Sequence, residues 1–309
     1  MASLKELAKR QEGLVGGHRA CAGCGASAAI RQILLAAGDK PTVCGICTGC
    51  MEVVTTIFPF TAWNVNLVHN AFENSAATTS GMEAAYKALK RNGKISEDMN
   101  FIAFGGDGGT YDIGLQSLSG AIERGHKMLY VCYDNGAYMN TGYQRSSATP
   151  YTAHTTTSPS GSKIPGKQQK RKDLTEIIVA HNPAYAAQTT PGYYMDLIRK
   201  VEKALAADGP SFINVLSPCV PGWGYPPEQS MNISKLAVET LFWPLYEWQD
   251  GKYKINVKPR EPKPVTEFLK QQARFRHIFK PGNEHLVEEI QAYVDKQWER
   301  LLGKEEASK

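Results

Sequence analysis

Five cysteines lie within thirty residues of one another near the start of the chain. They form two Cys-x-x-Cys pairs and one further thiol: Cys21 and Cys24, Cys44 and Cys47, and Cys50. Clustered, reduced thiols bind metals more often than they form disulfides, and thiolate sulfur is a ligand of both zinc ions and iron–sulfur clusters. The 19 residues between the two pairs fit a zinc ribbon, whereas Cys50 and the distant Cys219 do not belong to one. The spacing alone leaves zinc and a 4Fe–4S cluster equally open.

A second set of residues that could take part in chemistry is the run Gly106-Asp107-Gly108. It follows an apolar segment and precedes a segment of helical length. Glycine lets the backbone approach a diphosphate closely, and the amides of a helix N-terminus favour its charge. Asp107 offers a hard oxygen for Mg²⁺. Because Asn135 follows the next apolar segment, it is expected beside Asp107 at the carboxyl edge of a sheet. The alternative is a tight strand–helix turn that binds nothing.

These residues need strands and helices to position them. Helices are predicted from apolar i, i+3, i+4 spacing or helix-forming composition, and strands from short apolar runs between turn residues. The predicted helices cover 26–37, 76–92 and 113–124, and the predicted strands cover 101–104, 128–133, 184–187 and 211–216. The residues between the two cysteine pairs are expected to form a helix and then a strand, unlike the hairpins of a zinc ribbon. The pattern predicts an α/β fold, a parallel sheet with crossover helices.

The chain changes character after about residue 144. Residues 146–173 are rich in Ser, Thr, Gly, Pro and Lys, as in loops that are functional or mobile. The basic run 163–172 within them is most simply a solvated loop. We expect the chemistry in a domain over 1–225, followed by a C-terminal extension over 226–309 that packs on this domain or on partner subunits. The extension is predicted to contain helical segments near 265–277 and 283–302.

Composition narrows the function classes. The formal net charge is +5 and 42% of the residues are hydrophobic, which indicates a globular protein and gives no support for nucleic-acid binding. The N-terminus lacks the apolar core of a signal peptide, and no run approaches the roughly 18 apolar residues of a membrane span. We therefore expect a cytoplasmic protein without a membrane partner.

Five motifs, taken together, resemble the β subunits of the 2-oxoacid:ferredoxin oxidoreductase family. They are Gly17-His-Arg-Ala-Cys21-Ala-Gly-Cys24-Gly25, Thr48-Gly-Cys50-Met-Glu-Val53, Gly105-Gly-Asp-Gly-Gly-Thr110, Tyr133-Asp-Asn-Gly-Ala-Tyr-Met-Asn140-Thr-Gly142 and Ser217-Pro-Cys219. The similarity runs nearly end to end and is strongest to pyruvate:ferredoxin oxidoreductase, although enzymes for 2-oxoisovalerate and oxalate share the motifs. The resemblance implies a thiamine-diphosphate-binding fold with three cofactors: thiamine diphosphate, Mg²⁺ and one 4Fe–4S cluster.

Carried over residue by residue, the resemblance assigns the cluster to four cysteines, namely Cys21, Cys24, Cys50 and Cys219. Cys44 and Cys47 have no matching role and are expected to be buried nearby, although Cys47 lies three residues from Cys50 and is a competing ligand. Cys132 lies in a predicted strand and is expected in the core.

The same resemblance assigns the thiamine diphosphate site. Asp107, Asn135 and the backbone carbonyl of Ala137 would hold Mg²⁺, and Gly106, Gly108, Thr48 and Gly49 would complete the cofactor-binding set. Asn140 is the candidate catalytic residue, and its alternative role is to stabilise a turn at Gly142. His18, Arg19, Glu52 and Glu73 are weaker candidates.

The resemblance also implies a reaction and a set of partners. The expected reaction converts pyruvate and coenzyme A reversibly to acetyl-CoA, CO₂ and reduced ferredoxin. The sequence shows no second sheet for the aminopyrimidine of the cofactor, so partner subunits (α, γ and δ, or fused equivalents) are expected. The alternatives are the same chemistry on 2-oxoisovalerate or oxalate and, in a different class, a non-catalytic scaffold protein stabilised by zinc.

Overall fold

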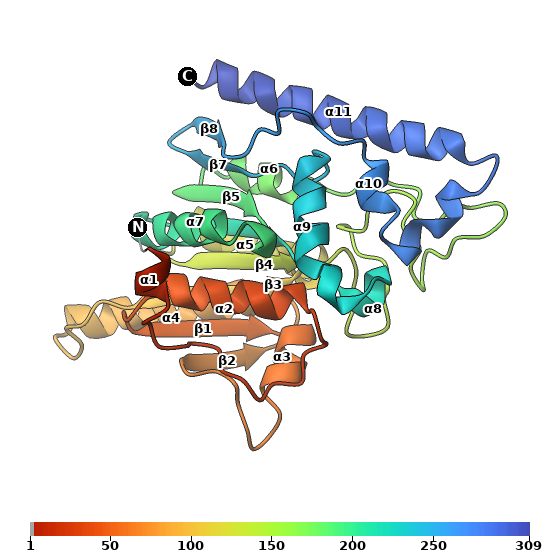
Figure 1. Cartoon of the computed structure of the whole chain (residues 1–309). Helices are drawn as coiled ribbons and strands as arrows, with labels where there is room; N and C mark the ends of the chain where they lie inside the picture. The colour runs from red at the N-terminus through yellow and green to blue at the C-terminus, as the bar shows by residue number, and fades with distance from the viewer. Residues whose placement is uncertain (1–2) are drawn as a thin grey trace.

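An eight-stranded sheet in the order β2-β1-β3-β4-β6-β5-β7-β8 runs through the computed structural model, which describes residues 3–309 (Figure 1). The first six strands in this order are parallel, β7 pairs antiparallel with β5, and β8 pairs antiparallel with β7. The strands are β1 (Thr42–Cys47), β2 (Asn66–Asn70), β3 (Asn100–Gly106), β4 (Leu129–Asp134), β5 (Tyr185–Thr189), β6 (Ser211–Leu216), β7 (Tyr246–Gln249) and β8 (Lys252–Ile255). Parallel neighbours connected through helices place their carboxyl ends along one edge, where α/β proteins bind ligands.

Helices cover both faces of the sheet (Figure 1). The α-helices are α1 (Leu4–Leu7), α2 (Gly25–Ala37), α3 (Cys50–Thr55), α4 (Ser75–Arg91), α5 (Leu115–Glu123), α6 (Leu174–Val179), α7 (Tyr194–Ala206), α8 (Val220–Trp223), α9 (Ser230–Glu239), α10 (Thr266–Leu269) and α11 (Glu284–Ala307). A π-helix spans Gly108–Ile113, and 3₁₀ segments span Pro191–Tyr193, Pro227–Gln229 and Ala273–Phe279. Helices α2 and α7 pack on one face of the sheet, whereas α4, α5 and α6 pack on the other.

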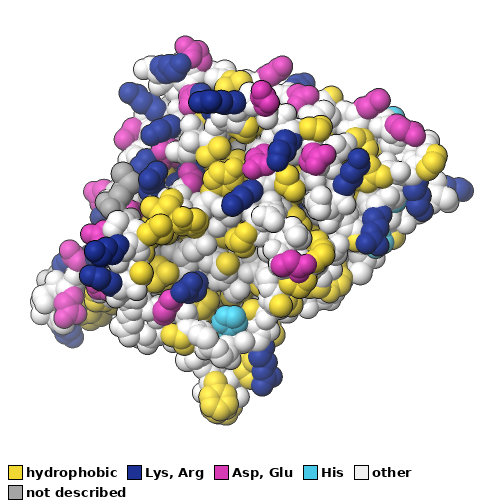
Figure 2. Space-filling model, viewed as in Figure 1, with side chains coloured by type: hydrophobic (Ala, Val, Ile, Leu, Met, Phe, Trp, Pro, Cys, Tyr) yellow, Lys and Arg dark blue, Asp and Glu magenta, His cyan; other side chains and the backbone are white. Residues whose placement is uncertain are grey.

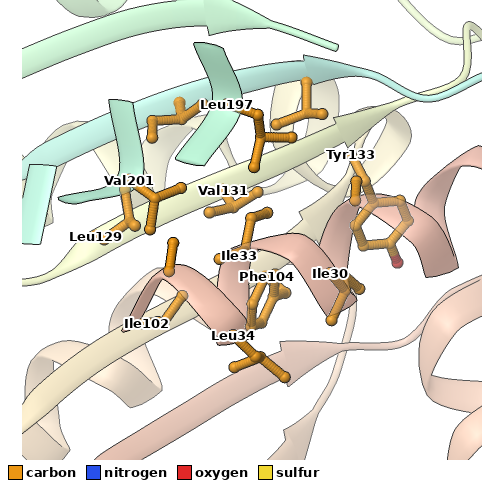
Figure 3. Packing of buried hydrophobic residues seen from close by; sticks show 14 of the residues in the cluster. Ile30, Ile33, Leu34, Ile102, Phe104, Leu129, Val131, Tyr133, Leu197 and Val201 are labelled. Atoms are coloured by element: carbon orange, nitrogen blue, oxygen red, sulfur yellow. The ribbon is translucent and has the colours of Figure 1, made fainter. Parts of the chain in front are cut away.

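The central strands are buried on both faces, as the short apolar runs predict. Along β3, Ile102 and Phe104 belong to the core under α2 and α7, and Phe101 and Ala103 belong to the core on the opposite face. Figure 3 shows the first of these cores, with the labelled side chains Ile30, Ile33 and Leu34 of α2, Leu197 and Val201 of α7, Ile102 and Phe104 of β3, and Leu129, Val131 and Tyr133 of β4. Because each buried side chain of this size contributes about 1.5–3 kcal/mol, this core holds the strand tips in fixed positions.

The predicted α/β fold is confirmed, and all four strands that were placed by residue range are present. The predicted helices correspond to α2, α4 and α5, and the helix predicted over 113–124 is preceded by the π-helix that begins at Gly108. The predicted parallel sheet is extended at one end, where β7 and β8 of the C-terminal extension form an antiparallel hairpin. Its turn is Asp250-Gly251, with φ of 51° and 77°, which is a common hairpin signal that the sequence carried.

Residues 226–309 pack against the rest of the chain through a third core that joins α8, α9, α10 and α11. The helix predicted over 283–302 is α11, which is longer at its C-terminus. The segment predicted as a helix over 265–277 is instead the short α10, an extended Gln272 and a 3₁₀ helix. Since β7 and β8 extend the main sheet, the extension is built into the fold, and a domain boundary near residue 225 stays a prediction.

The surface combines charges of both signs with one projecting apolar loop (Figure 2). This loop joins α3 to β2 and hangs at the foot of the molecule in Figure 1. Phe58 and Phe60 in it are 94% and 76% exposed. Among the described residues, no helix is long and apolar enough to cross a bilayer.

Candidate functional site

A pocket at the carboxyl edge of the sheet brings together eight of the residues singled out from the sequence. Its lining includes Thr48, Gly49, Gly106, Asp107, Gly108, Asn135, Ala137 and Asn140. They come from the ends of β1, β3 and β4, which are neighbours in the sheet. Cys50 lines the same pocket, so the candidate diphosphate site and one candidate cluster ligand adjoin each other.

The glycines of the loop after β3 are required by close packing. A Cβ on Gly108 would lie 2.2 Å from the ring of Tyr138, and one on Gly109 would lie 2.9 Å from the carbonyl oxygen of Phe72. The hydroxyl of Tyr138 donates to the carbonyl oxygen of Gly108 at 2.9 Å and so fixes the loop against the segment after β4. The backbone is therefore exposed to the pocket at the point where the next helix begins, which suits a diphosphate.

Three oxygen-bearing groups converge at the floor of this pocket. The side-chain amide of Asn135 lies 2.8 Å from the carbonyl oxygen of Ala137 and 2.9 Å from Oδ1 of Asp107. Turned one way, the amide nitrogen donates to both groups; turned the other way, three oxygens face one another. Three converging oxygens with one carboxylate are a donor set that Mg²⁺ accepts. The residues present therefore fit the ion that the resemblance implied.

Asp107 is the buried acid of this group, with 1% of its surface exposed. Burial raises the pKa of its carboxyl, and the carboxylate of Asp134 raises that pKa further. The hydroxyl of Ser146 donates to Asp107 and favours the charged form only in part. A divalent cation would reverse this balance, because its charge stabilises the carboxylate directly.

A buried polar network lies behind the segment that carries Asn135 and Ala137, and sequence reasoning missed it. Asp134 is fully buried, and one of its carboxylate oxygens accepts from the backbone amide of Gly136 at 3.1 Å. The other accepts from Arg171 and, at 2.6 Å, from the hydroxyl of Tyr111. Asn214 in turn donates to that hydroxyl at 2.8 Å. The network therefore clamps the turn that carries Asn135 and Ala137.

The expectation that 163–172 is a solvated loop is wrong for two of its cations. Lys167 is 1% exposed, and its ammonium donates to the carbonyl oxygens of Thr149 and Ser147 at 2.6 and 3.3 Å. Arg171 forms the buried ion pair with Asp134. The basic composition predicted a solvated loop, but the loop folds back under the pocket. There the hydroxyl of Thr149 also donates to the carbonyl oxygen of Gly136 at 2.7 Å.

Three of the four candidate cluster cysteines lie at helix starts. Cys24 precedes α2, Cys50 begins α3 and Cys219 precedes α8. The amide of Cys24 donates to the carbonyl oxygen of Cys21 at 3.0 Å, which closes the Cys-x-x-Cys turn. The amide of Gly25 donates to the carbonyl oxygen of Pro218 at 3.0 Å, so the two cysteine segments lie side by side.

The thiols of these cysteines affect one another. Burial and, to a smaller extent, the other cysteines of the set raise the pKa of Cys50 and that of Cys219 to about 12. Such thiols stay protonated at neutral pH until a metal centre displaces their protons. Within residues 3–309, no three His, Cys, Asp or Glu side chains lie close enough to hold a single metal ion. The four thiols are thus neighbours without forming a single-ion site.

The other three cysteines are buried in the structure. The thiol of Cys47 lies under the glycine loop, where the backbone amide of Gly106 donates to it, and burial raises its pKa to about 11. Cys44 and Cys132 lie within β1 and β4. Cys47 therefore faces the diphosphate loop, whereas the thiol neighbours of Cys50 are Cys21, Cys24 and Cys219.

The weaker candidates are spread more widely. His18 lines an open groove beside Cys21 and Cys24. Glu52 lies 3.7 Å from the imidazole of His69, and Arg19 and Glu73 are exposed. The structure brings none of these four side chains into the pocket that holds Asp107.

Comparison with known proteins agrees with this geometry. Residues 47–215 match the family model described as the C-terminal TPP binding domain of thiamine pyrophosphate enzymes. The fold is similar to a solved 2-oxoglutarate:ferredoxin oxidoreductase from Magnetococcus marinus, with a TM-score of 0.55 and 20% identity over 68% of this chain and 67% of that one. Fold and site together define a member of the thiamine pyrophosphate enzymes.

Relatives place the chain more narrowly. It is 56% identical to pyruvate synthase subunit PorB of Thermotoga maritima, over 99% of this chain and 96% of that protein. It is 54% identical to pyruvate synthase subunit PorB of Methanocaldococcus jannaschii, over 95% and 97%, and 45% identical to ketoisovalerate oxidoreductase subunit VorB of Pyrococcus abyssi, over 94% and 93%. The chain belongs to this family of 2-oxoacid oxidoreductase subunits, as its motifs predicted.

Proposed function

We propose that the chain is the β subunit of a pyruvate:ferredoxin oxidoreductase, which converts pyruvate and coenzyme A reversibly to acetyl-CoA and CO₂ while reducing ferredoxin. The observation that carries the proposal is the 56% identity, over nearly the full length of both chains, with a pyruvate synthase subunit. Identity to the ketoisovalerate oxidoreductase subunits is lower, at 45–46%. The same reaction on 2-oxoisovalerate is therefore the second candidate, and oxalate has no support among these relatives.

The pocket residues hold the cofactor of this reaction. Asp107, Asn135 and the carbonyl oxygen of Ala137, which converge in the pocket, would hold Mg²⁺. The backbone at Gly106 and Gly108 approaches the diphosphate, and Thr48 and Gly49 close the other side of the pocket. When bound, thiamine diphosphate serves as the electron sink for loss of CO₂ from a 2-oxo acid, and the 4Fe–4S cluster takes up electrons singly. Binding and orientation are the contribution of this chain.

The ligands that we propose for the cluster are Cys21, Cys24, Cys50 and Cys219. The mutual electrostatic influence of their thiols supports placing the four cysteines around one metal centre, and the resemblance favours a 4Fe–4S cluster over zinc. Three of the four cysteines lie at helix starts, where backbone amides would favour the negative charge of a cluster. Since Cys50 lines the diphosphate pocket, a cluster held there would adjoin the cofactor.

Asn140 is the residue that we propose to contact the substrate. Its side chain is exposed at the rim of the pocket, five residues beyond Asn135. A neutral amide there can donate to a carboxylate or carbonyl oxygen of a 2-oxo acid and orient it without adding charge. We expect Asn140→Ala to lower kcat while leaving the bound thiamine diphosphate unchanged.

Partner subunits complete the enzyme. The chain supplies a diphosphate pocket, and the matched family model describes only the C-terminal cofactor-binding domain of such enzymes. The aminopyrimidine half, the further clusters that reach ferredoxin and most of the coenzyme A site belong to the α, γ and δ subunits or their fused equivalents. A cytoplasmic location suits the reduced thiols.

The substrate assignment is tested by co-expressing the chain with its partner subunits and purifying the complex anaerobically. The complex should reduce ferredoxin with pyruvate and coenzyme A, with a kcat/KM at least tenfold above that for 2-oxoisovalerate. The reverse preference would assign it to the second candidate. A colourless complex that holds zinc in place of iron would instead support the scaffold alternative.

A further inference from the structure

Arg274 lies beside the helix that follows Cys219 and beside the turn that carries Asn135 and Ala137. It belongs to the 3₁₀ helix Ala273–Phe279, and its guanidinium carbon lies 4.1 Å from the centre of the Trp223 ring. Trp223 is the last residue of α8, the helix that Cys219 precedes, and its indole nitrogen donates to the carbonyl oxygen of Asn135 at 2.6 Å. A Cβ on Gly136 would lie 2.9 Å from Nη1 of Arg274. The guanidinium therefore contacts both sides of the site.

The charge of Arg274 has no acidic partner of its own. The side chain is 6% exposed, and within residues 3–309 it forms no ion pair; its one side-chain hydrogen bond runs from Nε to Oε1 of Gln272 at 2.9 Å. The buried acids nearby have other partners, since Asp134 pairs with Arg171 and Asp107 is placed to bind Mg²⁺. A buried cation left without a counter-charge costs several kcal/mol, so an anion beside Arg274 is expected.

The cysteine side of the site offers that anion. Burial lowers the pKa of Arg274 to about 9, Cys219 is the neighbour that raises it most, and an arginine remains charged at neutral pH. With four thiolate ligands, a 4Fe–4S cluster is an anion in both of its usual oxidation states. It gains one further negative charge when it accepts an electron. A fixed positive charge therefore stabilises the reduced form more than the oxidised form.

We propose that Arg274 is a positioning residue that raises the reduction potential of the cluster by placing a buried positive charge between it and the cofactor pocket. The proposal rests on the function proposed above, because it requires that Cys219 and its three companions hold a cluster. Removing the charge should shift the reduction equilibrium toward the oxidised cluster by tenfold or more, the order expected for a unit charge at an effective dielectric constant of about 20. A tenfold change in a one-electron couple is about 59 mV.

The test is a redox titration of the anaerobically purified complex, followed by the electron paramagnetic resonance signal of the reduced cluster. Arg274→Gln removes the charge, Arg274→Lys keeps it, and Arg276→Gln is the matched control, because Arg276 is exposed on the same 3₁₀ helix. Iron and acid-labile sulfide are measured first, so that a wild-type complex without a cluster refutes the proposed function and not the role of Arg274.

We expect a more negative potential in Arg274→Gln and a wild-type potential in both Arg274→Lys and Arg276→Gln. Equal potentials in Arg274→Gln and the wild type, with full iron in both, would overturn the proposal. Where Arg274→Gln loses its iron, full iron in Arg274→Lys supports it, because the charge alone then distinguishes the two variants. Loss of iron in both variants would show that the shape of the guanidinium matters and would contradict it.

Discussion

The diphosphate pocket and the cysteine site adjoin each other, yet the chain builds them to different degrees. In the pocket, Asp107, Asn135 and Ala137 come from the tips of two neighbouring strands, and the side-chain amide of Asn135 already lies within 2.9 Å of the other two. The cysteines come from three segments far apart in the sequence, and no three of their thiols within residues 3–309 form a single-ion site. Backbone hydrogen bonds of the sheet fix the first set, whereas helix starts and loops carry the second.

The difference has a thermodynamic consequence. The oxygen site should keep its shape without an ion, because Ser146, Tyr138 and the Arg171–Asp134 pair hold its residues in place. The cysteine site should depend on its cluster for order, since protonated thiols are uncharged and form only weak hydrogen bonds with their surroundings. We therefore expect pocket variants to affect cofactor binding and leave stability nearly unchanged. Cysteine variants should affect both.

The largest effect is expected from Asp107→Ala, which removes the carboxylate from the three converging oxygens. Affinity for thiamine diphosphate and Mg²⁺ should fall by more than about 100-fold, since even residues behind a metal ligand are worth about 10–100-fold. The thiamine content of the purified complex measures cofactor binding, and its circular dichroism shows whether the fold is retained. Asp208→Ala is the control, because the side chain of Asp208 is 97% exposed. Normal thiamine content in Asp107→Ala would show that the Gly-Asp-Gly run is only a turn and does not bind the cofactor.

The complementary change is Cys219→Ala. It should remove the cluster, so that the purified complex loses the four iron atoms of that cluster while the clusters of the partner subunits keep theirs. It should also lower the midpoint of thermal unfolding. Cys132→Ala and Cys47→Ala are matched controls, since both thiols are buried away from the set. If Cys219→Ala kept its iron and Cys47→Ala lost it, the ligand set would need to be redrawn with Cys47 in it.

A smaller effect is expected from Arg171→Gln, which leaves Asp134 with one fewer donor behind the metal-binding turn. Affinity for thiamine diphosphate should fall about 10–100-fold while iron content stays at the wild-type value. Lys163→Gln, an exposed cation in the same loop, should change neither quantity. Equal loss of iron and thiamine in Arg171→Gln would show that the diphosphate pocket and the cysteine site form one unit, and would contradict the difference drawn between them.

The smallest predicted effect is a pH dependence due to Lys167. Burial and the charges of Arg145 and Arg171 lower its pKa from the usual 10.5 to about 7. Between these two values the unfolded chain binds the proton and the folded chain does not, so the free energy of unfolding rises with pH. The slope due to this group is at most about 1.4 kcal/mol per pH unit.

Chemical denaturation of the wild type and of Lys167→Met at pH 7, 8 and 9 isolates this slope, because the other titrating groups are common to both proteins. Lys163→Met, which removes an exposed charge from the same loop, should follow the wild type. Parallel curves for the wild type and Lys167→Met would mean that the buried ammonium keeps its ordinary pKa.

The pocket could be predicted from the sequence because local rules suffice there. Short apolar strands fix where β3 and β4 end, and neighbouring parallel strands bring Asp107 and Asn135 together. The role of Arg171 could not be predicted, because a loop of 28 residues without periodicity gives no signal of which cation folds back under the pocket. The hairpin of β7 and β8 was missed for a different reason: its Asp250-Gly251 turn was visible, but the strands beside it are short and partly polar.

The central claim is that this chain provides one half of a thiamine diphosphate site with its adjoining cluster, and that the enzyme works only as an assembly. The most direct test is pyruvate- and coenzyme A-dependent reduction of ferredoxin by the chain alone, supplied with iron, sulfide, Mg²⁺ and thiamine diphosphate, beside the same chain in its complex. We expect turnover by the complex and none above background by the isolated chain. Turnover by the isolated chain at a rate comparable with that of the complex would contradict it.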